Sequence, residues 1–239
     1  MAVIIKGTVK IAKTIVPTDI AGLKLWLDAS DSTTLFQNSN GTTPAIADSD
    51  PIGYWGDKSG NGKNAIQADS TKKPILKTGL QNGKNVLLSD GVNDVMVLPS
   101  TTILSQPFTY FIAMKFLRTN VYERVTMGYN DGGNFEALAN SGYQFYSGSA
   151  FSAGTRNTNS FLLTAVYNST ASSARINATS LISGNLGVKS PGELYIFSGF
   201  SNYNPSNMRF YEFLIYDSVL PDNNRNSIES YLNTKWGIY

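Results

Sequence analysis

Residues 108–116 read Phe108-Thr-Tyr-Phe-Ile-Ala-Met-Lys-Phe116, and this stretch sets the expectation for the whole chain. Every second residue in it is large and apolar, so that one face would carry Phe108, Tyr110, Ile112, Met114 and Phe116. A period of two is typical of a β-strand, because successive side chains point to opposite faces of a sheet. The stretch therefore predicts a strand that lays one face against a hydrophobic core.

Short segments of the same kind occur on both sides, separated by clusters of Gly, Asn, Ser and Pro. They are residues 23–27, 85–88, 95–98, 161–167, 194–200 and 208–216, with weaker candidates at 121–127 and 143–146. In the segment 208–216, strict alternation places Phe210 on one face and Tyr211, Phe213 and Ile215 on the other. Many short strands with turn signals between them favour a sandwich of antiparallel sheets. A parallel α/β fold would need helices between the strands, and the chain leaves no room for them.

The composition limits the possible functions. The chain has 239 residues, which suits one all-β domain, and its charged residues make up only 15%. A net charge of +2 is too small for a nucleic-acid-binding surface. The absence of cysteine and histidine excludes thiol nucleophiles, Ser-His-Asp triads and the usual zinc sites. No apolar run has the length of a membrane span, so membrane insertion is not expected.

One helix is expected, at residues 221–236. Asp222 stands near its start, where an acid favours the positive end of the helix dipole. Residues Ile228, Tyr231, Leu232 and Trp236 fall on one apolar stripe. Gly237 follows as a stop signal. The stripe predicts a helix that packs onto the sandwich.

Four segments resemble, in order, the laminin-G-like domains of the concanavalin A-like jelly-roll superfamily. The first is Gly-Leu-Lys-Leu-Trp-Leu-Asp-Ala-Ser-Asp at 22–31, and the second is Tyr-Trp-Gly-Asp-Lys-Ser-Gly-Asn-Gly-Lys-Asn-Ala-Ile-Gln at 54–67. The third spans 82–94, where Ser89-Asp90-Gly91 stands in place of the usual Phe-Asp-Gly, and the fourth closes the chain from residue 210. Residues 117–190 match no segment of the family. The resemblance implies an all-β, concanavalin A-like jelly-roll sandwich of two antiparallel sheets at 21–239, with one short C-terminal helix.

Five aspartates beside Gly and Asn in turns are candidate metal ligands: Asp28, Asp31, Asp57, Asp90 and Asp94. Carboxylates and backbone carbonyls are the oxygen ligands that Ca²⁺ prefers, and the resemblance allows calcium as the one expected cofactor. The alternative is that these side chains cap turns through hydrogen bonds to backbone amides.

Aromatic residues in turn-rich surroundings are candidate ligand-binding residues: Trp55, Tyr129, Tyr143, Tyr146 and Tyr203. Aromatic faces suit sugar rings, and Tyr adds a polar group. The alternatives are core packing for Trp55 and ordinary strand ends for the tyrosines. Trp26 and Trp236 are expected in the core.

Catalysis is not expected, and no catalytic residue is proposed from the sequence. Jelly-roll glycoside hydrolases of the laminarinase type carry Glu-x-Asp-x-x-Glu on one strand, which places paired carboxylates in a cleft. Glutamate occurs here only at 123, 136, 193, 212 and 229, and none of them begins such a run.

Residues 1–20 form a basic, strand-like N-terminal arm before the first family-like segment. Apolar or small residues alternate with polar ones from residue 5 to residue 11, and Pro17 ends the pattern. The arm is either an edge strand of the domain or an anchor that adds a strand to a partner's sheet. The candidate anchor residues are Ile5, Lys6, Val9, Lys10 and Ile11.

The N-terminal sequence does not read as a signal peptide, because lysines interrupt its apolar residues. A lectin-like sandwich without an export signal favours a bacteriophage virion protein: a capsid fibre or decoration, or a tail-fibre adhesin. The protein would be oligomeric on the virion surface. It would bind other capsid or tail proteins through the arm, and the sandwich would face a host surface glycan or protein. The alternatives are a bacterial cell-surface carbohydrate-binding module and, less favoured, a polysaccharide-cleaving hydrolase or lyase.

Overall fold

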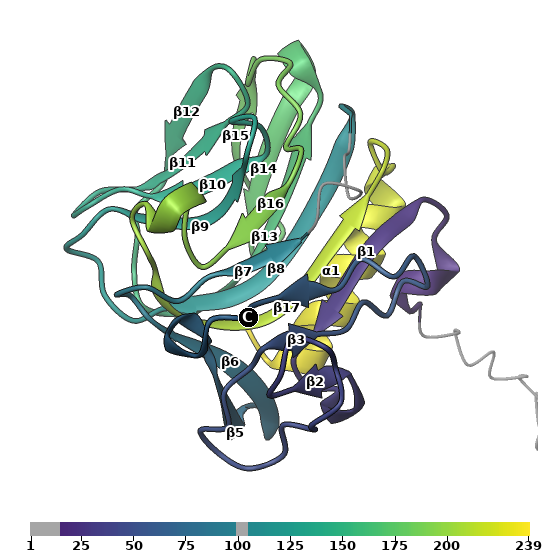
Figure 1. Cartoon of the computed structure of the whole chain (residues 1–239). Helices are drawn as coiled ribbons and strands as arrows, with labels where there is room; N and C mark the ends of the chain where they lie inside the picture. Colours follow the sequence, from purple (N-terminus) through teal and green to yellow (C-terminus); the bar gives the residue numbers. More distant parts are fainter. Residues whose placement is uncertain (1–14, 99–104) are drawn as a thin grey trace, which may run out of the picture.

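The computed structural model describes residues 15–98 and 105–239, and it forms a sandwich of two antiparallel sheets (Figure 1). Sheet A contains β1 (Leu23–Asp28), β5 (Ile75–Gln81), β6 (Lys84–Asp90), β8 (Phe108–Phe116), β13 (Ser160–Tyr167), β14 (Ser172–Ile176), β15 (Thr179–Gly184) and β17 (Asn207–Tyr216). Sheet B contains β2 (Leu35–Phe36), β3 (Tyr54–Trp55), β4 (Ala65–Ile66), β7 (Met96–Leu98), β9 (Glu123–Gly128), β10 (Asn134–Ala137), β11 (Tyr143–Tyr146), β12 (Ala150–Ala153) and β16 (Leu194–Ile196). The helix α1 (Asp222–Trp236) closes the chain. The expected all-β fold with one C-terminal helix is confirmed.

Short 3₁₀ turns connect the strands: η1 (Pro17–Asp19), η2 (Ser32–Thr34), η3 (Ser70–Lys72), η5 (Ser169–Ala171) and η6 (Phe200–Asn202). Sheet A runs in the order β15-β14-β13-β8-β17-β6-β5, and sheet B in the order β12-β11-β10-β9-β16-β7-β4-β3-β2. β17 is the centre of sheet A. It pairs with β8 on one side, and on the other side with β6 along its first half and β1 along its second half.

The core between the sheets contains the residues that the alternation predicted. Phe108, Tyr110, Ile112, Met114 and Phe116 of β8 all lie in it and are fully buried. They meet Leu194 and Ile196 from sheet B. The period-two prediction for this strand is confirmed.

The alternation predicted for β17 is wrong, because Phe210 and Phe213 both face the core between the sheets. The pairing of β17 with β8 shifts between Phe210 and Glu212, which inserts one extra residue, Tyr211. A β-bulge of this kind lets two successive residues point to the same side. Tyr211 and Glu212 therefore both face α1.

The helix α1 covers the outer face of sheet A, next to β1 and β17 in Figure 1. Ile228, Leu232 and Trp236 are fully buried in a second apolar cluster between helix and sheet, as predicted. Trp26 is a correction: it packs against this second cluster and stays partly exposed, whereas its neighbours Leu25 and Leu27 point between the sheets.

The candidate anchor residues Ile5, Lys6, Val9, Lys10 and Ile11 lie outside the described residues. Residues 15–20, which the prediction assigned to the arm, pack on the sandwich. Ile15 and Ile20 contact the cluster under α1. The Tyr216 hydroxyl also donates a hydrogen bond of 2.9 Å to the carbonyl of Pro17. The described domain therefore begins no later than residue 15.

Candidate functional site

The outer face of sheet B carries a group of aromatic and polar side chains. In β16, Leu194 and Ile196 point into the core, so the intervening Tyr195 points outward. In β9, Val125 points inward and Arg124 outward by the same alternation. Because β9 and β16 are paired, these outward side chains lie on adjacent strands.

An aromatic cluster builds up from this face toward the surface. The Phe200 ring, on η6, lies 5.7 Å from Tyr195 and 5.0 Å from Tyr129, both edge to face. The Arg124 guanidinium lies 4.9 Å from the ring centre of Tyr203. Tyr129, Phe200 and Tyr203 remain 56%, 46% and 57% exposed. We call Arg124, Tyr129, Tyr195, Phe200 and Tyr203 the outer aromatic face.

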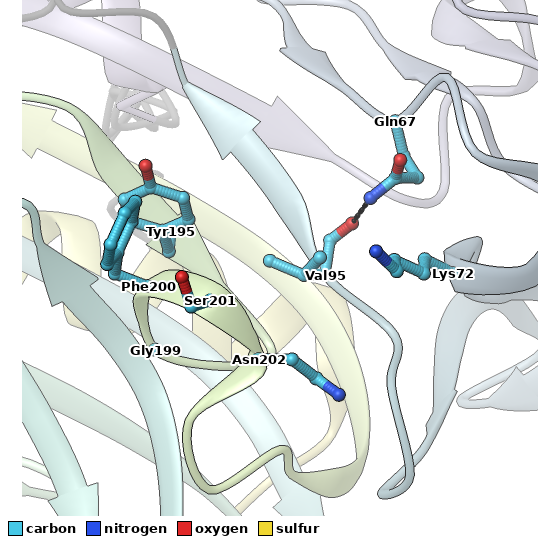
Figure 2. Close-up of a pocket in the computed structure, with 8 residues that line it drawn as sticks. All are labelled: Gln67, Lys72, Val95, Tyr195, Gly199, Phe200, Ser201 and Asn202. Carbon is cyan, nitrogen blue, oxygen red and sulfur yellow. Dashed lines mark hydrogen bonds between the residues drawn. The ribbon is translucent and has the colours of Figure 1, made fainter.

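A pocket of about 450 Å³ opens beside the outer aromatic face (Figure 2). Tyr195 and Phe200 form one side of it, and Gln67 and Lys72 stand on the other (Figure 2). Hydrogen bonds between segments that are distant in the sequence hold the walls of the pocket together. Gln67 donates to the carbonyl of Val95 at 2.8 Å, and Asn202 next to Phe200 donates to that of Val92 at 3.1 Å. We call this the outer pocket.

The hydroxyl of Tyr195 is fixed as a donor. Burial, with the neighbouring Glu193 carboxylate that accepts its hydrogen bond, raises the pKa of Tyr195 above its ordinary value. Beneath the same face, Glu136 is buried and forms an ion pair of 2.7 Å with Arg124. Arg124 pairs with one oxygen of that carboxylate, and burial raises the pKa of Glu136 to about 7. The same guanidinium lies over the exposed ring of Tyr203.

The structure separates the five predicted aromatic ligand-binding residues. Tyr129 and Tyr203 belong to the outer aromatic face. Tyr146 points outward from β11, two strands beyond β9, with the Lys189 ammonium 5.8 Å from its ring centre. Trp55 and Tyr143 are 0% and 2% exposed and pack in the core between the sheets, and Tyr143 also lines a small pocket beside Gly154 and Phe161.

The five predicted metal ligands do not come together at one place. Asp28 and Asp31 share the ammonium of Lys58, at 2.7 and 2.8 Å. Burial alone would raise the pKa of Asp28, but the ammonium groups of Lys235 and Lys58 hold it below its ordinary value. Asp31 also caps η2 by accepting from the amide of Thr33.

The other three predicted ligands, Asp57, Asp90 and Asp94, also cap turns. Asp57 accepts from the backbone amides of Trp26 and Ser59, at 2.9 and 2.8 Å, and so ties β1 to the turn after β3. Asp90 accepts from the amide of Val92 at 2.8 Å. The carboxylate of Asp94 accepts from the amide of Asp90 at 2.8 Å.

The hydrogen bonds that these aspartates accept from backbone amides agree with the alternative prediction, in which they cap turns. Across residues 15–98 and 105–239, no three acidic side chains gather closely enough to hold a metal ion. Calcium binding stays a prediction, and thermal unfolding with calcium and with a chelator measures it.

A buried polar cluster that the sequence did not predict lies under α1. Glu212 is fully buried and accepts hydrogen bonds from the indoles of Trp26 and Trp236, at 2.6 and 2.7 Å. The Lys235 ammonium bridges Glu212 and Asp28, at 2.7 Å to each. We call these five residues the Glu212 cluster. The sequence signal for it was a lone glutamate between Tyr211 and Phe213 in an apolar strand.

Phe200, Tyr195 and Arg124 are the site residues that sequence reasoning missed. The available signal was Gly199-Phe-Ser-Asn-Tyr203, in which two aromatic residues stand in a short Gly, Ser and Asn segment typical of an exposed turn.

No family model matches the sequence, and no curated protein matches it. Among solved structures, Trypanosoma rangeli sialidase is similar, with a TM-score of 0.61 and 14% identity over 91% of this chain and 34% of that chain. The same sialidase with sialic acid gives a TM-score of 0.60 and 15% identity, over 92% and 35%. The receptor-binding domain of botulinum neurotoxin D gives 0.59 and 12%, over 88% and 53%. The chain thus spans a third to about half of these proteins.

At these identities the similarity concerns the fold: an antiparallel β-sandwich, as in a jelly roll. In the described part of the chain, no helix is both long and apolar enough to span a bilayer.

Proposed function

We propose that the chain is a non-enzymatic recognition module that binds carbohydrate at the outer aromatic face and the outer pocket. The observation that carries the proposal is the exposure of Tyr129, Phe200 and Tyr203 together on one face of the sandwich. Exposed aromatic rings beside a pocket offer flat apolar surface for the C–H face of a sugar ring. The amides of Gln67 and Asn202 and the ammonium of Lys72 stand at the same pocket to meet hydroxyl groups.

The fold neighbours support a binding role. One is a receptor-binding domain of a toxin, and others are sialidases, of which the present chain spans about a third. The non-enzymatic part of the proposal rests on the sequence, which has no Glu-x-Asp-x-x-Glu run on a strand. Glycoside hydrolysis needs two carboxylates that flank the scissile bond.

A screen of the full chain against immobilised oligosaccharides tests this proposal. We expect saturable binding to at least one glycan, and a loss of at least about tenfold in affinity for Tyr129→Ala and for Phe200→Ala. Tyr239→Ala is the matched control, because Tyr239 is similarly exposed, at 52%, and lies outside the outer aromatic face. Absence of binding to every glycan, or equal losses in all three variants, contradicts the proposal.

The finer proposal is a phage virion component, displayed on the particle surface and held by the N-terminal arm. Its support is the alternating, basic sequence of residues 5–11. The test compares the full chain with a chain that starts at Ile15, since residues 15–20 belong to the sandwich. We expect equal stability and loss of incorporation into particles for the shortened chain. Equal incorporation contradicts the anchor.

A further inference from the structure

A second pocket, of about 360 Å³, opens where β5 and β17 begin and β6 ends. It shares no lining residue with the outer pocket, although Asp94 directly precedes Val95 of that pocket. Ile75, Leu88 and Leu117 give it apolar walls, and Asp90 and Asp94 supply its two carboxylates. We call it the acidic pocket. Its lining combines a mostly apolar surface with a few charged groups, which is the usual make-up of a small-molecule site.

Asp94 is the unusual member of this lining. It is only 6% exposed, yet within the described ranges its carboxylate accepts a hydrogen bond from the Asp90 amide and has no cationic partner. Burial, together with the charge of Asp90, raises the pKa of Asp94 to about 6. A buried carboxylate that faces a pocket without a counter-charge is costly to the fold, and such groups are concentrated at binding sites.

Two basic side chains around the acidic pocket, Lys73 and Arg118, are engaged elsewhere, whereas Arg209 on β17 lies opposite Leu88, on the same face of sheet A. The Lys73 ammonium donates to the carbonyl of Gln37 at 2.9 Å, which leaves its aliphatic stem at the pocket wall. The Arg118 guanidinium packs on Gly91 and pairs with Glu123 at 2.6 Å. The charge of Asp94 is therefore open to a cation from outside.

We propose that the acidic pocket binds a primary ammonium group carried on an aliphatic stem. The ammonium would pair with Asp94, and Asp90 at the rim would add attraction. The stem would lie along Ile75, Leu88 and Leu117. A metal ion fits this lining less well, because Asp90 and Asp94 are its only carboxylates and no three acidic side chains gather closely in the described ranges. The ligand is either a free alkylamine or a lysine side chain of a peptide, which share this chemistry.

The test is a titration of the full chain, followed by NMR, with n-butylammonium and with 1-butanol as its uncharged counterpart. At pH 7.5 we expect saturable shifts at the amides of Leu88, Asp94 and Leu117, and at least tenfold weaker binding of butanol. Asp94→Asn should reduce n-butylammonium affinity at least tenfold. Lowering the pH to 5 should reduce it about tenfold, because Asp94 is then mostly protonated. Acetyl-Gly-Lys-Gly-amide is titrated in parallel. Tighter binding of this peptide than of n-butylammonium indicates a lysine side chain as the ligand, and weaker binding indicates a free alkylamine.

Asp50→Asn is the matched control, because it removes a carboxylate outside the acidic pocket. Equal affinity for n-butylammonium and butanol overturns the proposal. Unchanged n-butylammonium affinity in Asp94→Asn also overturns it, provided that the NMR spectrum of the variant shows the same fold as the parent. Calcium chloride alone, titrated in the same way, overturns it if calcium shifts these amides and n-butylammonium does not.

Discussion

The Glu212 cluster and the outer aromatic face are both rich in aromatic and charged groups, but they lie on opposite sides of the sandwich and in different kinds of sequence. The cluster is hydrogen-bonded around the fully buried Glu212, and its residues come from the family-like segments at the two ends of the chain. The outer aromatic face is half-exposed and comes from residues 124–203. The Glu212 cluster thus comes from segments that carry the resemblance, whereas the outer aromatic face comes from a part of the chain outside them.

Removing the charge at the centre of the Glu212 cluster should have the largest effect. Glu212→Ala leaves two indole N–H groups unpaired and takes one of the two carboxylates from Lys235. We expect a loss of about 5 kcal/mol in the free energy of unfolding, measured by denaturant titration. Glu193→Ala, which removes a partly exposed glutamate just before β16, serves as control with a loss under about 1 kcal/mol. Similar losses in the two variants contradict a structural role specific to the cluster.

Trp236 allows the packing and the hydrogen bond in the cluster to be separated. Trp236→Ala should cost about 4 kcal/mol, because it empties a fully buried site between α1 and sheet A. Trp236→Phe keeps most of the apolar volume and loses the N–H donated to Glu212, so it should cost about 1–2 kcal/mol. Thermal unfolding measures both. If the two variants cost the same, the hydrogen bond outweighs the packing and the account of this cluster is wrong.

Asp94 provides the contrast of a buried carboxylate that has no cationic partner among residues 15–98 and 105–239. Its pKa is raised to about 6 in the folded chain, above its ordinary value of 3.8. The group therefore favours the folded state below about pH 4, and this contribution is lost as the pH rises through 6. Between pH 4 and pH 7.5, the free energy of unfolding of Asp94→Asn should rise by about 1 kcal/mol relative to that of the parent. This value is smaller than the full pKa shift implies, because the carboxylate opens onto a pocket and solvent screens it. Unfolding curves at both pH values measure it, and a constant difference between the two proteins refutes the unpaired charge.

The outer aromatic face should contribute least to stability. Tyr203→Ala and Phe200→Ala remove side chains that are half-exposed, so each should lower the free energy of unfolding by less than about 1 kcal/mol. Denaturant titration of the same preparations used for binding measures this. A loss above about 3 kcal/mol would make this face part of the structural core.

Much of the fold was predictable because it rests on local pattern. The alternation of β8 and the apolar stripe of α1 each lie within one continuous segment, so the sequence indicates which side is buried. β2, β3 and β4 have two residues each, which is too short for a period to show. The bulge at Tyr211 was also hidden, because one extra residue reverses the alternation without changing the composition.

The candidate site was predictable only in part. Tyr129 and Tyr203 stood out as tyrosines in turn-rich segments. Their meeting with Arg124 and Phe200 depends on the pairing of β9 with β16, which are far apart in the chain. The burial of Trp55 and Tyr143 could not be predicted, because the local composition around a strand end does not indicate which way its aromatic residue points.

The central claim is that the outer aromatic face binds carbohydrate without supporting the fold. It is tested most directly by measuring the dissociation constant for the glycan found in the screen and the unfolding midpoint of one sample of Phe200→Ala. We predict a dissociation constant at least about tenfold higher than that of the parent, with a midpoint within a few degrees of it. An unchanged dissociation constant in a variant with an unchanged midpoint would contradict the claim.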